Sequence, residues 1–161
     1  MSGSVSTASP LTVEEAYNIV APLYEALNEP DKKNPYALLA QAAHPDYRSY
    51  HTNEDFLTRD QLADVFVGVG ATVPDLHWEI RDLQTFGDQV VVRGEATGTP
   101  TGEFWGVEPT GKGFKTMAID IHELVHQQVR STRRPTCSSQ RIIRVRSGIA
   151  KERSTIYDNE T

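Results

Sequence analysis

The hydrophobic pattern of this chain changes its period near Pro74, and this change limits the folds that the sequence can adopt. Before Pro74, apolar residues recur at spacings of three and four, which is typical of helices with one buried face. After Pro74, apolar and polar residues alternate, which is typical of strands. Helices followed by antiparallel strands predict an α+β domain, with a curved antiparallel sheet covered on one face by about three N-terminal helices.

Three helices are expected in the first half of the chain. The first starts after Thr12, which stands three residues before Glu15, in the spacing of a capping box. Pro22 lies inside this helix and predicts a kink or a short break. The second helix is expected over about residues 36–43, and the third starts after Thr58.

The strands are predicted from alternation. They are expected over residues 47–51, 76–86, 90–101 and 116–125. The second of them places four apolar residues on one face: Leu76, Trp78, Ile80 and Phe86. Gly87-Asp88 is a two-residue turn candidate between the second and third strands. A curved sheet covered by helices in this way tends to leave a cavity at its mouth.

Composition limits the classes of function. The 161 residues are enough for one domain with a sizeable core. The single cysteine, Cys137, cannot form an internal disulfide, and no apolar run reaches the ~20 residues of a membrane span. We therefore expect a cytoplasmic protein without membrane contact. Residues 1–10 are Ser-rich and are expected to form a disordered tail.

The charge is unevenly distributed. The net charge is −6, yet residues 126–161 carry eight basic and only three acidic side chains. The simplest interpretation is a solvated basic tail, and the alternative is an arm that contacts nucleic acid or the acidic body of the chain. The basic residues have no aromatic among them before Tyr157, so nucleic-acid binding is not expected.

Residues 106–113 read GVEPTGKG, which is close to a phosphate-binding loop. Pro109 removes a backbone donor, and Glu108 places a carboxylate where phosphates would lie. The residues that follow alternate as a strand, whereas a phosphate loop opens a helix. The segment is therefore predicted to be a turn between two strands, and nucleotide binding is not expected.

Asp120 and His122 are the candidate catalytic pair. They stand two apart on one strand, so their Cα atoms lie about 6.5–7 Å apart on the same face. A carboxylate beside an imidazole in an apolar-lined cavity is a plausible acid/base pair. The alternative is that both face solvent or make hydrogen bonds across the sheet.

Aromatic residues and one further histidine are candidates for substrate binding. The aromatic residues are Tyr24, Phe66, Trp78, Phe104 and Trp105, which would suit a flat aromatic substrate but are equally explained by core packing. His51 is a candidate for the mouth of the pocket. The five histidines show no HxH or HExxH pairing, so no metal site is expected.

Two segments resemble a known family. Residues 98–114, which read GTPTGEFWGVEPTGKGF, resemble the signature hairpin of the SnoaL-like polyketide cyclases, in the nuclear-transport-factor-2-like superfold. HPDY at residues 44–47 resembles the HPxY segment of the same family. The resemblance covers about residues 11–130 and implies a cone-shaped α+β barrel, often a homodimer. It also implies ring closure by intramolecular aldol condensation, with no metal or cofactor.

The catalytic residues of the family are only partly matched. The position of the family's acid/base aspartate falls at about Arg134, so that role is not carried over. The family's Gln-x-His pair falls at Ala118 and Asp120, and its helical asparagine falls near Phe66. Tyr24 matches a pocket tyrosine. Residues 131–161 lack the aromatic-rich last strand of the family and are interpreted as a divergent basic tail, natural or from a shifted frame or retained intron, with at most one short strand.

Two functions follow from these observations. The first is a cofactor-independent cyclase or isomerase that transfers a proton next to a carbonyl in a small polyketide-like substrate, with Asp120 and His122 as acid and base. The second is a non-catalytic domain of the same fold that binds a small ligand or dimerises.

Overall fold

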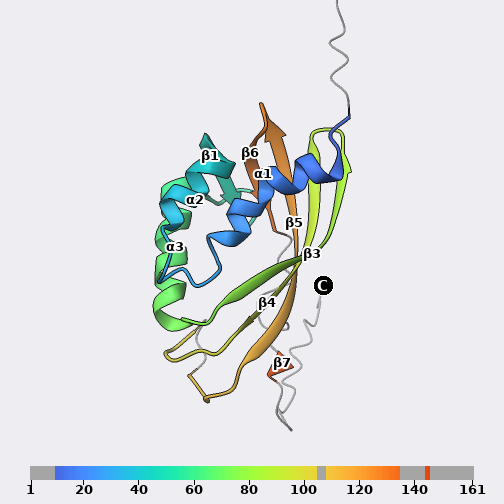
Figure 1. Cartoon of the computed structure of the whole chain (residues 1–161). Coiled ribbons are helices and arrows are strands. Elements are labelled where there is room, and N and C mark those ends of the chain that lie inside the picture. The colour runs from blue at the N-terminus through green and yellow to red at the C-terminus, as the bar shows by residue number, and fades with distance from the viewer. Residues whose placement is uncertain (1–9, 105–107, 135–143, 146–161) are drawn as a thin grey trace, which may run out of the picture.

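The structure is a computed structural model that describes residues 10–104, 108–134 and 144–145. Most of the expected N-terminal tail, Trp105 and most of the basic tail after Arg134 therefore lie outside the described residues. Figure 1 shows the arrangement of the helices and strands.

Three helices precede most of the strands, as the sequence predicts. They are α1 (Val13–Glu25), α2 (Pro35–Ala42) and α3 (Arg59–Thr72). Thr12 and Glu15 form the expected capping box of α1, and Thr58 forms a second one with Gln61 at the start of α3. The first helix continues through Pro22 without a break. The N–H of Ala26 donates to the Pro22 carbonyl, so the turn that follows the proline is intact.

The strands form one curved, unclosed sheet. They are β1 (Ala43–Tyr50), β2 (Phe56–Thr58), β3 (His77–Phe86), β4 (Gln89–Gly98), β5 (Phe114–Val125), β6 (Gln128–Arg133) and β7 (Arg144–Val145). The order across the sheet is β2-β1-β6-β5-β4-β3, and β7 pairs with β5. All described pairs are antiparallel except β1 with β6, which is parallel, so the sheet is mixed.

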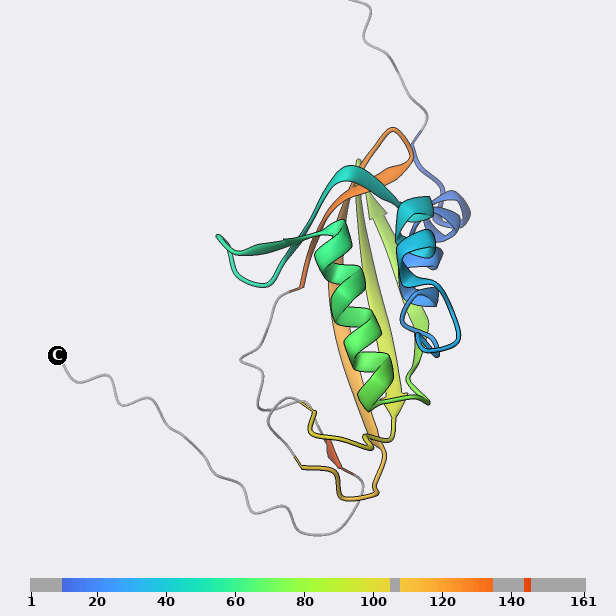
Figure 2. The same cartoon turned by 90° about the vertical axis from the view of Figure 1, so that its left-hand side faces the viewer.

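The α+β class with helices on one face of a curved sheet is confirmed. Figures 1 and 2 show all three helices on the same face of the sheet. The segment 99–113 connects β4 to β5. The last residue of β4, Gly98, pairs with the first residue of β5, Phe114. Gly111 lies in this connection with a φ of 74°, a conformation that glycine adopts without strain. EPTGKG, the described part of the stretch GVEPTGKG at residues 108–113, thus lies in a β-hairpin connection, as predicted.

Four details of the strands differ from the prediction. β2 was not expected, and β1 starts at Ala43, earlier than expected. β6 runs across residue 130, where the domain was expected to end. In β3 the register shifts between Ile80 and Asp82, which turns Phe86 outward, with 59% of it exposed. Such a bulge moves every later side chain to the opposite face.

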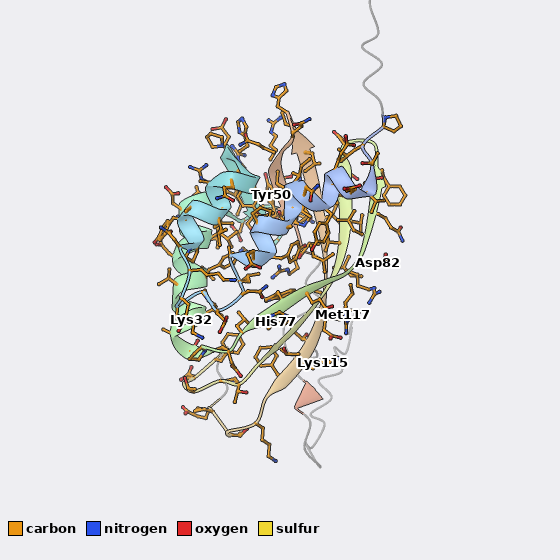
Figure 3. The ribbon with its side chains drawn as sticks, in the orientation of Figure 1. Lys32, Tyr50, His77, Asp82, Lys115 and Met117 are labelled. Carbon is orange, nitrogen blue, oxygen red and sulfur yellow. The ribbon has the colours of Figure 1, made fainter. Side chains whose placement is uncertain are left out.

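The two faces of β5 have an unusual distribution of polarity. Its inward face carries Asp120 and His122, which are 1% and 2% exposed. Its outward face carries Met117 and Ile119, which are 51% and 41% exposed. Figure 3 labels Met117 on the side of the sheet away from the helices. Between Met117 and His122 the strand therefore buries polar residues and presents apolar ones to the outside, whereas Phe114 and Leu124 near its ends are buried.

Candidate functional site

A small polar cavity lies between the sheet and helices α1 and α3, with a volume of ≈ 50 Å³. Residues from α1, α3, β1, β5 and β6 and the residue after β6 line it. Its polar lining includes Tyr24, Tyr47, Asp120, His122, Thr132 and Arg134. These six residues come from separate segments of the chain, and the fold gathers them at one place on the inner face of the sheet.

The pairing of β5 with β6 brings four of these residues together. His122 stands opposite Thr132, and Ile121 stands opposite Arg133. One step further along the same register, Asp120 meets Arg134. Because side chains alternate along a strand, these two cross-strand pairs share one face of the sheet.

Arg134 binds Asp120 through two hydrogen bonds. Its Nε donates to Asp120 Oδ1 at 2.6 Å, and its Nη2 donates to Oδ2 at 3.2 Å. The Asp120 side chain is 1% exposed, whereas that of Arg134 is 39% exposed. The pair therefore has a buried anionic end and a cationic end that reaches solvent.

Tyr24 connects Asp120 to His122. Its hydroxyl donates to Asp120 Oδ2 at 2.9 Å and lies 2.8 Å from His122 Nε2. On the other side of the imidazole, His122 Nδ1 lies 2.8 Å from Thr132 Oγ1, to which Tyr47 also donates at 2.8 Å. Asp120 and His122 share one face of β5, as predicted, and Tyr24 lies between them. The hydrogen bonds across the sheet that were considered as the alternative are also present, to Arg134 and Thr132.

The pKa values define the charges in this network. Burial alone raises the pKa of Asp120, but the charge and hydrogen bonds of Arg134, followed by His122 and Tyr24, hold it below its ordinary value of 3.8. Burial lowers the pKa of His122 from 6.5 to about 4; Arg134 adds to this effect and Asp120 opposes it. Burial and then Asp120 raise the pKa of Tyr24 well above 10. At neutral pH, Asp120 is therefore a carboxylate, His122 is neutral and Tyr24 is protonated.

These charges determine which group donates and which accepts in each hydrogen bond of the network. The Asp120 carboxylate can only accept, so the single proton of Tyr24 points to it. The Tyr24 oxygen must then accept from His122, which places the imidazole proton on Nε2. His122 Nδ1 is left as an acceptor for the Thr132 hydroxyl, whose oxygen accepts from Tyr47. Every hydrogen bond from Tyr47 onward therefore points toward Asp120.

The other predicted site residues lie in three different places. His51 and Phe66 line the polar cavity. Trp78 lies beside it, with its ring 6.3 Å from the Tyr24 ring and 5.3 Å from Arg134 Cζ. Phe104 stacks on Phe114, with centroids 5.8 Å apart. Since Phe114 precedes Asp120 by six residues along β5, Phe104 is about 20 Å from the acid/base network and packs in the core instead. Trp105 lies outside the described residues.

Sequence reasoning missed three members of the network. Tyr47 and Thr132 were not singled out, and Arg134 was treated only as a lost aspartate. The signal that could have found them is the antiparallel register of β5 and β6. If β6 had been predicted, His122 opposite Thr132 would have placed Asp120 opposite Arg134.

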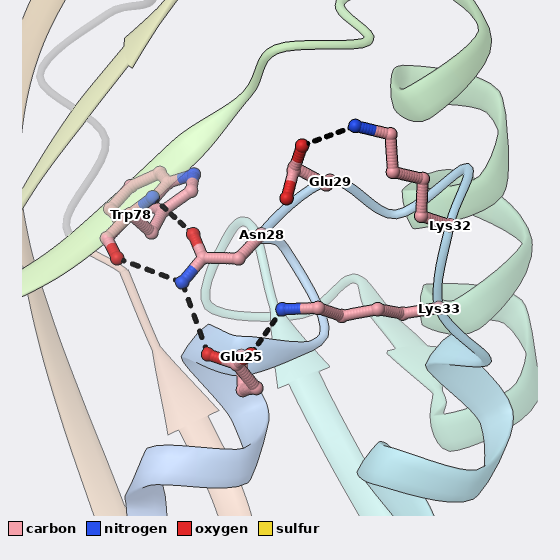
Figure 4. A network of polar contacts seen from close by, with 6 residues as sticks. All are labelled: Glu25, Asn28, Glu29, Lys32, Lys33 and Trp78. Atoms are coloured by element: carbon pink, nitrogen blue, oxygen red, sulfur yellow. Dashed lines mark hydrogen bonds and ion pairs between the residues drawn. The ribbon is translucent and has the colours of Figure 1, made fainter.

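A larger cavity of ≈ 510 Å³ lies between α1, α2 and the start of β3, and Tyr24 and Trp78 line it. Figure 4 shows polar contacts at its edge, where the side-chain amide of Asn28 bonds the backbone N–H and C=O of Trp78. Glu25 also lines this cavity, is 49% exposed and pairs with Lys33. We place the chemistry in the smaller cavity because its titratable groups are buried and have perturbed pKa values.

Two further tests bear on the class of protein. Among the described residues, no group of three or more His, Cys, Asp or Glu side chains is placed to hold a metal ion. None of the described helices has the length and apolar character that crossing a bilayer requires.

Solved structures with the same fold are numerous. TsrD from Streptomyces laurentii is 23% identical with a TM-score of 0.65, over 76% of this chain and 87% of that one. A candidate SnoaL-like polyketide cyclase from Jannaschia sp. CCS1 is 21% identical with a TM-score of 0.66, over 80% and 89%. IdmH, a candidate polyketide cyclase from Streptomyces antibioticus, is 25% identical with a TM-score of 0.61, over 73% and 88%.

The sequence comparisons give a family. A search of curated protein sequences gave no significant match. The family model for SnoaL-like polyketide cyclase matches residues 19–134, which include every residue of the polar network. That match covers well over half of the chain, and the protein therefore belongs to the SnoaL-like polyketide cyclase family.

Proposed function

We propose that this protein is a cytoplasmic, cofactor-independent cyclase or isomerase that acts on a polyketide-like substrate by proton transfer next to a carbonyl. The observation that carries the proposal is the buried network of Asp120, Tyr24 and His122, in which one ionised carboxylate touches a chain of neutral donors. Family membership supports a cyclase-type or isomerase-type activity. The substrate and the mechanism are our inference from the network.

In the proposed reaction, Asp120 is the base. A C–H bond next to a substrate carbonyl breaks, its proton moves to the Asp120 carboxylate, and the electron pair moves onto the carbonyl oxygen to form an enolate. Tyr24 donates to Asp120 and His122 Nε2 donates to Tyr24, so these two neutral donors hold the carboxylate in place for the transfer. Asp120 is suited to this role because it stays ionised at neutral pH and is shielded from water.

The enolate then has two outcomes. In a cyclase, its carbon attacks a second carbonyl of the same molecule, and the new alkoxide takes a proton to become a hydroxyl. In an isomerase, Asp120 returns the proton to a different carbon. Both outcomes restore the Asp120 carboxylate and need no oxidant or reductant.

The cavity limits how the substrate binds. Pockets that enclose a whole small-molecule ligand have volumes of about 300–1,000 Å³, whereas this one has ≈ 50 Å³. It can therefore hold only the reacting end of a substrate, and the remainder must extend past the half-exposed side chain of Arg134. His51 and Phe66 also line this cavity and would contact the substrate near its reacting end.

The function is tested by hydrogen exchange. The wild-type protein is expected to accelerate deuterium uptake in heavy water at the carbons next to the carbonyl of 2-tetralone, a flat aromatic-fused ketone, measured by proton NMR. The reference is the rate with equal concentrations of acetate and imidazole, which supply the same chemical groups without the protein. No acceleration over this reference would reject the enzyme and favour the non-catalytic ligand-binding or dimerising domain.

We also propose that the protein is a homodimer that packs through the outer face of its sheet. Phe86, Met117 and Ile119 are 59%, 51% and 41% exposed, and the last two lie together on the outward face of β5. An apolar strip of this kind is typical of an association surface. Its burial in a dimer would explain why β5 has apolar residues on the outside.

Replacing Ile119 with lysine is expected to convert the dimer to a monomer, because a charge would be buried without a partner in the interface. The mass in solution, measured by light scattering after size-exclusion chromatography, checks this. Val65→Lys is the matched control, since Val65 is 44% exposed on α3, away from the sheet. A wild-type protein that is monomeric, or an Ile119→Lys variant that remains dimeric, would reject the proposed interface.

A further inference from the structure

We propose that Arg134 is the group that binds the enolate, and that it selects 1,3-dicarbonyl substrates by holding both of their oxygens. This inference rests on the proposed function. It assigns a positive role to the position where the family's aspartate is absent, and it names the chemical class of the substrate.

The guanidinium of Arg134 has two usable edges. A guanidinium carries five N–H groups in one plane, so that one edge presents Nε and Nη2 and the other presents Nη1 and Nη2. Asp120 occupies the first edge. Within the described part of the chain, Arg134 makes hydrogen bonds only through Nε and Nη2, so the second edge keeps a parallel pair of N–H groups for a ligand.

The second edge is both accessible and held in place. Arg134 borders the polar cavity and has 39% of its side chain exposed, so a ligand can reach it from solvent. Two contacts fix its plane: Asp120 on one edge, and the Trp78 ring, whose centroid is 5.3 Å from Cζ. A donor pair that is already oriented costs little rearrangement when the ligand gains charge.

The charges favour the enolate over the substrate. Before proton transfer, the positive charge of Arg134 is balanced by the Asp120 carboxylate. When Asp120 takes the proton it becomes neutral, and the negative charge moves to the enolate. The attraction of Arg134 for the ligand thus becomes strong only as the proton moves, which is the differential binding that accelerates a reaction.

The geometry of the free edge favours two oxygens over one. Two parallel N–H groups match an acceptor with two coplanar oxygens, as in carboxylates. The enolate of a 1,3-dicarbonyl has two oxygens on the same side that share the charge, whereas the enolate of a simple ketone has one. A β-keto ester or β-diketone would therefore satisfy both N–H groups of Arg134.

The test measures binding of a stable enolate. 3-Acetyl-4-hydroxycoumarin is a flat aromatic 1,3-dicarbonyl that is ionised at neutral pH, and its acetyl oxygen and 4-oxygen lie on the same side. 3-Acetylcoumarin, which lacks the 4-oxygen, is its neutral analogue. Calorimetric titration is expected to show that the wild type binds 3-acetyl-4-hydroxycoumarin, with 3-acetylcoumarin weaker by at least about tenfold. Arg134→Met is expected to weaken binding of 3-acetyl-4-hydroxycoumarin by about tenfold to a hundredfold, and Arg134→Lys, which keeps the charge but not the edge, by about tenfold.

Two further variants separate this role from a loss of folding. Arg133→Met is the matched control, since the exposed Arg133 lies over the Tyr50 ring instead, and binding should not change. Asp120→Asn is expected to bind 3-acetyl-4-hydroxycoumarin more tightly than the wild type, because Arg134 keeps its charge without a carboxylate partner. A misfolded variant cannot give that result.

The outcomes distinguish the two proposals. If the enolate does not bind the wild type, or binds Arg134→Met equally well, or binds no better than 3-acetylcoumarin, then the role of Arg134 is wrong even if 2-tetralone exchanges. If the enolate binds as expected but neither 2-tetralone nor the β-keto ester ethyl 3-oxobutanoate exchanges faster than with acetate and imidazole, the proposed enzyme is wrong, and Arg134 is then part of a ligand-binding site only.

Discussion

Replacing Asp120 with asparagine is expected to slow deuterium exchange of 2-tetralone about a thousandfold, within the range of general-base catalysis. Asparagine has nearly the same shape as aspartate, and its one oxygen, at the position of Oδ2, can still accept hydrogen bonds from Tyr24 and from Arg134 Nη2. Its NH2 group then faces Arg134 Nε and loses that one hydrogen bond. Its amide cannot take up a proton from carbon, however. The variant therefore removes the base while it keeps most of the cavity.

The matched control is Asp82→Asn. Asp82 lies on β3 and its side chain is exposed, so the same chemical change there should leave the exchange rate unaltered. Thermal unfolding of both variants checks that the fold is retained. An Asp120→Asn variant that is folded and exchanges at the wild-type rate would show that Asp120 is not the base.

Acidification is expected to destabilise the protein between about pH 6.5 and about pH 4 through His122. In the unfolded chain His122 takes up a proton near its ordinary pKa of 6.5, whereas in the folded protein burial delays this to a pKa of about 4. Between these values the unfolded state binds more protons, so the free energy of unfolding decreases as the pH falls. The loss from His122 amounts to about 3 kcal/mol once the pH is below both values.

Urea unfolding at a series of pH values checks this expectation. His122→Gln lacks a titrating ring and should show a much smaller loss of stability over the same interval. His77→Gln is the control, since His77 is exposed at the start of β3 and should behave as the wild type. Asp120, whose pKa lies below 3.8, adds a further loss only at lower pH. Equal losses in the wild type and in His122→Gln would contradict the assignment.

Local signals predicted most of the fold. The capping pair of Thr12 and Glu15 is present as expected, and so is the change from helical to strand periodicity. The hairpin between β4 and β5 follows from Pro109 and Gly111, which suit a turn and not a phosphate loop. These features depend on neighbouring residues, which is why the sequence alone was sufficient.

Features that depend on distant partners were harder to predict. The bulge near Arg81 reverses the facing of Phe86, and nothing in the alternating pattern marks it. β6 has few apolar residues because it points polar groups, Thr132 among them, into the cavity. A strand that faces a polar site therefore lacks the alternation by which strands are recognised.

The candidate site shows the same division. Asp120 and His122 were identified because they are close in sequence and share a face of one strand. Tyr24 was also a candidate, because it matches a pocket tyrosine of the family. Thr132 and Arg134, which bond His122 and Asp120, come from β6 and the residue after it and were not predicted. Hydrophobicity alone would assign Met117 and Ile119 to the core, whereas in the structure both side chains lie exposed on the outward face of β5.

The position of β6 has a consequence for how the chain assembles during synthesis. β6 is the last long strand of the described chain, yet it lies in the middle of the sheet, between β1 and β5. Until residues 128–134 have left the ribosome, β1 and β5 both present unpaired edges, which are prone to wrong pairing. The loop closure that joins β1 to β6 spans about half of the chain, and such non-local pairing is slow. Thr132 and Arg134 arrive with this strand, so the sheet and its polar site would be completed in a single late step.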